Sequence, residues 1–147
     1  MAKQKVLFIC IHNSARSQIA EELLRKLAGD RFEVESAGLK PGKLNPVVIE
    51  VLNEMGIDIS KKQTRAVFDC VKSGKIYNYV ITVCDETGAE RCPVFPGSAK
   101  RIHWSFPDPS KFEGTWKEKI SKTRAIREEI RQKIESWLKF YKKGAEL

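Results

Sequence analysis

A cysteine and an arginine six positions apart carry the clearest chemical signal in this sequence. Cys10 ends the apolar run KVLFIC, and Arg16 follows the short segment IHNSA. Backbone N–H groups in a strand-to-helix loop can converge on an anion, and the planar guanidinium of Arg16 can bind two of its oxygens. The same positive field favours the thiolate form of Cys10, to which the Ser17 hydroxyl can donate. We therefore expect a thiolate aimed at the centre of a tetrahedral oxyanion.

The loop between the cysteine and the helix can point successive backbone N–H groups inward at an anion, with the helix dipole reinforcing them. Asn13 tolerates a left-handed backbone and can brace the loop with its amide. A lone cysteine at a strand end is more often a small buried hydrophobe, but its place beside Ser17 at such a junction favours a nucleophile. The residues expected to surround the anion are consecutive: Ile11, His12, Asn13, Ser14, Ala15, Arg16 and Ser17.

Two further cysteines and an aspartate could take part in the same chemistry. Cys84 and Cys92 are separated by DETGAER, and they could be a redox pair, two unrelated core thiols or zinc ligands. Zinc is disfavoured because this spacing is poor for ligands and His103 is the only histidine nearby. Asp108, in FPDP, is either a turn former or a catalytic acid.

Alternating elements around these residues predict an α/β fold, with a four-stranded parallel sheet flanked by helices on both faces. Four helices are expected. The first begins at Asn13 or Ser14 and ends at Gly29, and the second runs from Asn45 to Gly56. The third lies within 60–74, and the fourth spans 115–142. The strands are expected at 5–10, 32–38, 76–84 and 100–104. Cys10 and Cys84 then fall at the carboxyl ends of strands, where such sheets bind ligands.

The composition is that of an ordinary globular protein. The 147 residues, 41% hydrophobic and 31% charged, predict a single domain over 1–147. No apolar run is long enough to cross a membrane, and the first one is too short for a signal peptide, so we expect a cytoplasmic protein without membrane partners. Thiols stay reduced there, which favours chemistry over a disulfide framework.

The net charge of +8 raises the question of nucleic acid. Much of the excess lies within 117–143, where glutamates are interspersed with the cations, as on a solvated helix face. No basic motif interleaved with aromatics is present, so a nucleic-acid or non-catalytic oxyanion-binding module is disfavoured.

A family resemblance extends over nearly all of the chain. The segment CIHNSARSQIAEELL resembles the active-site loop of the low-molecular-weight tyrosine phosphatases, whose fold is Rossmann/flavodoxin-like. The further motifs ESAG, NP, GIDIS, VITVCD, CP and HWSFPDP are similar to those of the thioredoxin-coupled arsenate reductases built on that fold. Two loop positions depart from it, with His12 and Ala15 where better-known relatives often carry Gly and Cys.

The resemblance implies a redox relay for arsenic detoxification. Cys10 would attack arsenate while Asp108 protonates the departing oxygen, and Cys84 would then attack Cys10, releasing arsenite. Cys92 would next form a disulfide with Cys84, which thioredoxin, the electron donor, would reduce. No bound cofactor is implied, phosphate or sulfate would compete with arsenate, and we expect a monomer. The alternative is a phosphatase that hydrolyses phosphate monoesters through a phosphocysteine at Cys10.

The resemblance also bears on a cation site and on the fourth cysteine. Some relatives bind potassium behind the loop through counterparts of Asn13, Glu21 and Ser36 and an aspartate. Arg65 stands at the aspartate position here, so we hypothesise that its guanidinium replaces potassium and pairs with Glu21. Cys70 matches no redox position and is interpreted as a buried bystander or a regulatory thiol.

Overall fold

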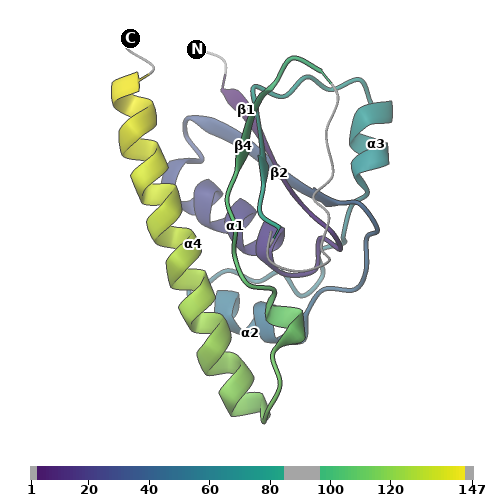
Figure 1. The fold of residues 1–147 in the computed structure, drawn as a ribbon, viewed down its shortest axis with the longest axis vertical. Coiled ribbons are helices and arrows are strands. Elements are labelled where there is room, and N and C mark those ends of the chain that lie inside the picture. Colours follow the sequence, from purple (N-terminus) through teal and green to yellow (C-terminus); the bar gives the residue numbers. More distant parts are fainter. Residues whose placement is uncertain (1–2, 85–96, 145–147) are drawn as a thin grey trace.

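Four parallel strands form the sheet at the centre of the molecule (Figure 1). The computed structural model describes residues 3–84 and 97–144, so Cys92 lies outside the described residues. The spatial order is β2-β1-β3-β4, with bounds Gln4–Cys10 for β1, Phe32–Gly38 for β2, Tyr79–Thr82 for β3 and Lys100–His103 for β4. Residues 6–10 of β1 are all buried, as expected for a central parallel strand covered on both faces. The predicted four-stranded parallel sheet is confirmed.

Helices cover both faces of this sheet. On one face, α1 (Arg16–Ala28) and α4 (Trp116–Gly144) share a core with Phe8 and Val6, and α2 (Pro46–Asn53) packs against α4. On the opposite face lies the short helix α3 (Val67–Lys72), which packs with Leu7 and Ile9 (Figure 1). Alternate residues of β1 therefore point into two separate cores.

The two helices near the nucleophile loop begin in different ways. Asn45 caps α2 as predicted, since its side chain accepts a hydrogen bond from the Val47 amide at 2.9 Å. The predicted cap of α1 by Asn13 or Ser14 is wrong, because α1 begins after Ala15 without a side-chain cap. The Asn13 side chain instead bonds to Ser17 and Ser36, so it is not available to the helix end.

The segment before α3 is more extended than predicted. The sequence allowed a short helix within 60–74 that could begin as early as Ser60, but α3 begins only at Val67. Ala66 forms a parallel bridge with Gly38 at the end of β2, and the Gly38 amide donates to the Arg65 carbonyl at 2.8 Å. Pairing with the end of β2 therefore keeps residues 65 and 66 out of the helix.

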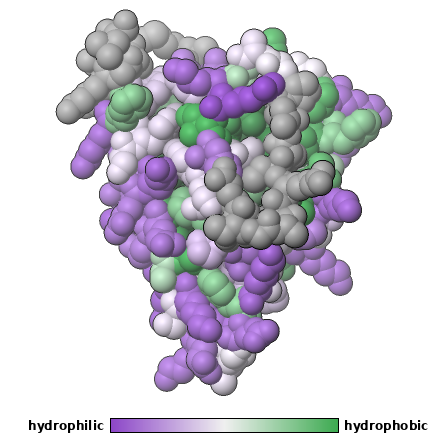
Figure 2. All heavy atoms as spheres, viewed as in Figure 1, coloured by the Kyte–Doolittle hydropathy of each residue, from purple (hydrophilic) through white to green (hydrophobic). Residues whose placement is uncertain are grey.

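The long helix α4 presents its charged side to solvent. Ile126, Ile130 and Ile134 are buried against the sheet, whereas Arg131 pairs with Glu128 and Glu135 on the outer side. Figure 2 shows hydrophilic side chains along this helix. These contacts agree with the interpretation of a solvated helix face. In the described part of the chain, no helix has the length and apolar character needed to cross a membrane.

Candidate active site

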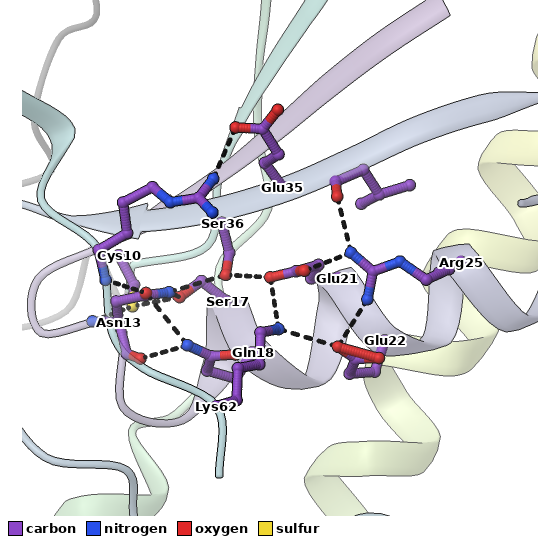
Figure 3. A network of polar contacts seen from close by, with 12 residues as sticks. Cys10, Asn13, Ser17, Gln18, Glu21, Glu22, Arg25, Glu35, Ser36 and Lys62 are labelled. Atoms are coloured by element: carbon purple, nitrogen blue, oxygen red, sulfur yellow. Dashed lines mark hydrogen bonds and ion pairs between the residues drawn. The ribbon is translucent and has the colours of Figure 1, made fainter. Parts of the chain in front are cut away.

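Cys10 lies at the carboxyl end of β1, beneath the loop that leads into α1 (Figure 3). Its side chain is almost fully buried, at 3% exposed. The Ser17 hydroxyl lies 2.8 Å from Cys10 Sγ, and the Asn13 backbone N–H donates to the same sulfur at 3.1 Å. The Asn13 amide and the Ser17 hydroxyl thus meet at one sulfur, where each can hydrogen-bond to it.

The Asn13 side chain sets the direction of the hydrogen bonds around the sulfur. Its Oδ1 accepts from the backbone N–H of Arg65 at 2.9 Å and from Gln18 Nε2 at 3.1 Å. The amide nitrogen therefore faces the hydroxyls of Ser17, at 2.7 Å, and Ser36, at 2.9 Å. Because the Ser17 oxygen accepts from Asn13, its own hydrogen is directed to Cys10.

The segment after β2 holds the outer side of the loop. The amides of Leu39, Lys40 and Gly42 donate to the carbonyls of residues 10, 11 and 12 at 3.1, 2.8 and 2.9 Å. The exposed His12 adds a side-chain contact, with Nδ1 3.0 Å from the Lys40 carbonyl oxygen. His12 therefore braces the loop from outside.

Arg16 and Asp108 come together from positions far apart in the chain. Arg16 is buried, donates to the Phe106 carbonyl at 3.1 Å and approaches Asp108 Oδ2 at 3.7 Å. The other carboxylate oxygen of Asp108 accepts from the Ser110 amide at 2.9 Å, which caps the short 3-10 helix η1 (Pro109–Lys111). Asp108 is thus a turn former and also lies beside the predicted anion-binding arginine.

Cys84 lies in the same buried cluster as Cys10. Strands β1 and β3 are neighbours, with Ile9 opposite Thr82 and the Val83 amide bonded to the Ile9 carbonyl at 2.9 Å. Cys84 follows directly and is fully buried in the core that also holds Cys10 and Phe106. The structure thus brings together Cys10, Arg16, Asp108 and Cys84 at one edge of the sheet.

Comparison with known proteins identifies this arrangement. Residues 5–146 match the family model of the low molecular weight phosphotyrosine protein phosphatases. The chain belongs to this phosphatase family. It is 40% identical over 136 residues to an arsenate reductase of Bacillus licheniformis, covering 91% of this chain and 94% of that protein.

Solved structures give the same assignment. An arsenate reductase from Archaeoglobus fulgidus superimposes with a TM-score of 0.66 at 30% identity, covering 88% of this chain and 98% of that one. A thioredoxin-dependent arsenate reductase from Corynebacterium glutamicum gives a TM-score of 0.58 at 35% identity, covering 90% of this chain and 62% of that one. The described fold is thus the one expected for the phosphatase family.

The basic residue that pairs with Glu21 in this phosphatase-family chain is Lys62, not the expected Arg65. The hypothesis that Arg65 pairs with Glu21 is wrong, because the Arg65 guanidinium bonds to Glu35 at 2.6 Å. Lys62 Nζ lies 2.7 Å from Glu21 Oε1 instead, and Arg25 pairs with the other carboxylate oxygen (Figure 3). Lys62 was not predicted from the sequence, where its only signal was its place in the segment that follows GIDIS.

Cys70 lies away from the nucleophile, on the opposite face of the sheet. It is buried with Leu7, Ile9 and Tyr77, and burial raises the pKa of its thiol. A buried thiol that resists ionisation agrees with the bystander interpretation.

Proposed function

We propose that this protein is a thioredoxin-coupled arsenate reductase. Two kinds of observation support the proposal. First, relatives that match this chain over most of their own length are arsenate reductases. Second, Cys84 is buried in the same hydrophobic cluster as Cys10. The position of Cys84 carries the argument, because hydrolysis of a phosphate ester needs Cys10, Arg16 and Asp108 but no second thiol. A second cysteine at the neighbouring strand end is what a reduction requires.

The first step is a displacement at arsenic. The loop amides and Arg16 hold the oxyanion, and the Cys10 thiolate attacks arsenic to form a sulfur–arsenic bond. Asp108 donates a proton to the departing oxygen, which leaves as water. Phosphate and sulfate bind the same loop and compete, because they present the same tetrahedral set of oxygens.

A displacement at the Cys10 sulfur, followed by thiol–disulfide exchange with Cys92 and with thioredoxin, completes the cycle. The Cys84 thiolate attacks the Cys10 sulfur, the sulfur–arsenic bond breaks, and its electron pair stays on arsenic, which leaves as arsenite. Cys92 then attacks Cys84 and releases Cys10 as a thiolate. The resulting disulfide between Cys84 and Cys92 takes two electrons from the thioredoxin dithiol, so the overall transfer balances.

Serine variants of the two relay cysteines test this function. In an assay with arsenate, thioredoxin, thioredoxin reductase and NADPH, we expect Cys84→Ser and Cys92→Ser to abolish steady-state NADPH consumption. Cleavage of p-nitrophenyl phosphate should persist in both, because it needs only the first nucleophile. Cys70→Ala is the matched control, since it removes a thiol on the other face of the sheet and should keep arsenate turnover. Normal arsenate turnover in either serine variant would refute the relay.

A phosphatase activity is the second candidate, and one feature near Asp108 favours it. A cavity of about 390 Å³ adjoins η1, lined by the aromatic side chains of Phe112 and Trp116 and the basic Lys43 and Lys119. An aromatic wall with cations suits a phosphorylated aromatic ring. If hydrolysis is the main activity, kcat/KM for aryl phosphates will exceed that for arsenate in the full reductase assay.

A further inference from the structure

We infer that Lys62 is a built-in counter-cation of the buried Glu21 carboxylate and, through it, a positioning residue for the Cys10 loop. The ammonium lies between two acidic side chains of α1, 2.7 Å from Glu21 Oε1 and 2.8 Å from Glu22 Oε2. The Glu21 side chain is only 6% exposed. A carboxylate buried to this extent needs a partner of opposite charge, and breaking such a pair is costly.

Hydrogen bonds connect this ion pair to the nucleophile (Figure 3). Glu21 accepts from the Ser36 hydroxyl, so the Ser36 oxygen is left to accept from Asn13 Nδ2 at 2.9 Å. The second hydrogen of the Asn13 amide goes to Ser17 at 2.7 Å, and the Ser17 oxygen lies 2.8 Å from Cys10 Sγ, to which its remaining hydrogen can be donated. An ionised Glu21 can only accept, which sets the donor direction along the whole chain of contacts.

The same contacts argue against a soluble cation at this place. Potassium would need the oxygens of Glu21, Ser36 and Asn13, but Lys62, Ser36 and Arg25 already occupy the carboxylate. Asn13 Oδ1 accepts from two N–H groups. Among the described residues of this network, only Gln18 Oε1 has no hydrogen-bond partner, and one oxygen cannot replace the shell of a hard cation. The residues present therefore do not fit the potassium site of relatives.

Cation dependence and phosphate binding together test the inference. The probe is inorganic phosphate, titrated calorimetrically into the reduced protein in potassium chloride and in choline chloride at equal ionic strength, with thermal unfolding followed in both salts. For the parent we expect the same affinity and unfolding midpoint in the two salts. A higher midpoint or tighter phosphate binding in potassium alone would overturn the inference.

Three substitutions separate the role of the charge from general effects. Lys62→Ala should weaken phosphate binding several-fold, and Lys62→Arg should retain more of the affinity than Lys62→Ala. The control is Lys61→Ala, which removes the same charge from the exposed neighbouring position and should bind phosphate like the parent. Equal affinities for Lys62→Ala and Lys61→Ala, or no benefit from arginine, would contradict the role.

A double variant covers the case in which Lys62→Ala does not fold. Glu21→Gln with Lys62→Met removes both charges, so it should fold and be more stable than Lys62→Met alone. If the double variant is no more stable than the single one, the two residues are not coupled and the inference fails. Any effect of Lys62 on arsenate turnover rests on the proposed function, whereas phosphate affinity and unfolding stability can be measured without it. A parent that binds phosphate without reducing arsenate would refute the function and leave the Lys62 inference to be decided by the variants.

Discussion

At the scale of single residues, Asn13 connects the nucleophile to the rest of the site. It is fully buried, and its φ of 55° places it in the left-handed region that asparagine tolerates better than most residues. Its side chain binds Ser17, Ser36, Gln18 and the Arg65 amide, so one amide group holds three separate segments in register. A change at this residue should therefore affect both stability and the direction of the Ser17 hydroxyl.

Asn13→Ala should lower the free energy of unfolding by about 2–4 kcal/mol, because buried donors and acceptors lose their partner and alanine is strained at positive φ. Asn13→Gly is the matched control, since it removes the same side chain without that backbone strain. Urea denaturation should find the glycine variant more stable than the alanine variant by about 1 kcal/mol. Equal stabilities would mean that the backbone at position 13 is unstrained in alanine.

At the scale of elements, the active-site loop depends on how closely the end of β2 approaches it. A Cβ built on Gly38 would lie 2.7 Å from the Asn13 nitrogen and 2.8 Å from the Ile11 carbonyl oxygen. These are backbone atoms, so the contact cannot be relieved by a rotamer change. Glycine at the end of β2 is therefore a requirement of the loop that follows β1.

Gly38→Ala should displace the loop and reduce both phosphate affinity and arsenate turnover by at least tenfold. It should also lower the free energy of unfolding by about 1–3 kcal/mol, the usual cost of overpacking. Gly42→Ala is a suitable control, because its Cβ would meet only the His12 side chain, at an ordinary 3.7 Å. Calorimetric phosphate titration of the two variants checks this, and comparable affinities would show that the strand end can move.

At the scale of the whole molecule, the face of the sheet opposite α1 supports the site from behind. Glu35 of β2 binds Arg65, Lys75 and the Tyr77 hydroxyl, which lie 30, 40 and 42 positions further along the chain. The backbone of Arg65 in turn donates to Asn13. This cluster therefore ties β2, the segment before α3 and the segment before β3 to the loop.

Acid should weaken this cluster. Burial alone would raise the pKa of Glu35, but hydrogen bonds and charge interactions with Lys75, Tyr77 and Arg65 bring it below its ordinary value of 4.5. A depressed pKa in the folded state means that the stabilisation is complete above the unfolded value and is lost as the pH falls through the folded one. Glu35→Gln should therefore cost about 1 kcal/mol at pH 7, and the cost should shrink as the pH falls below the ordinary value of 4.5.

Urea denaturation of parent and variant from pH 7 to pH 3 measures this difference. Glu33→Gln, on an exposed position of the same strand, removes a carboxylate without these partners and should show a smaller difference at every pH. A cost for Glu35→Gln that stayed constant down to pH 3 would exclude ionisation of Glu35 as its source.

Local patterns were enough to predict the nucleophile loop, the parallel sheet and the Asn45 cap. A buried strand, a loop of small residues and a helix are encoded by residues next to one another, so spacing alone placed Cys10 and Arg16. The shorter extent of α3 was missed because pairing of Ala66 with Gly38 overrides local helix preference. Local sequence patterns could not show that Asp108 lies near Arg16, because the two residues are far apart in the chain. Only the family resemblance placed Asp108 in the active site.

The choice of cation beside Glu21 was decided by tertiary structure alone. Lys62 and Arg65 are both basic and lie three positions apart, so composition and spacing could not tell which would pair with Glu21. The folded backbone directs Lys62 to Glu21 and Glu22 on α1, and it directs Arg65 to Glu35 of β2. Which carboxylate a lysine or arginine pairs with depends on the direction of its side chain, and that direction is fixed only by the folded backbone.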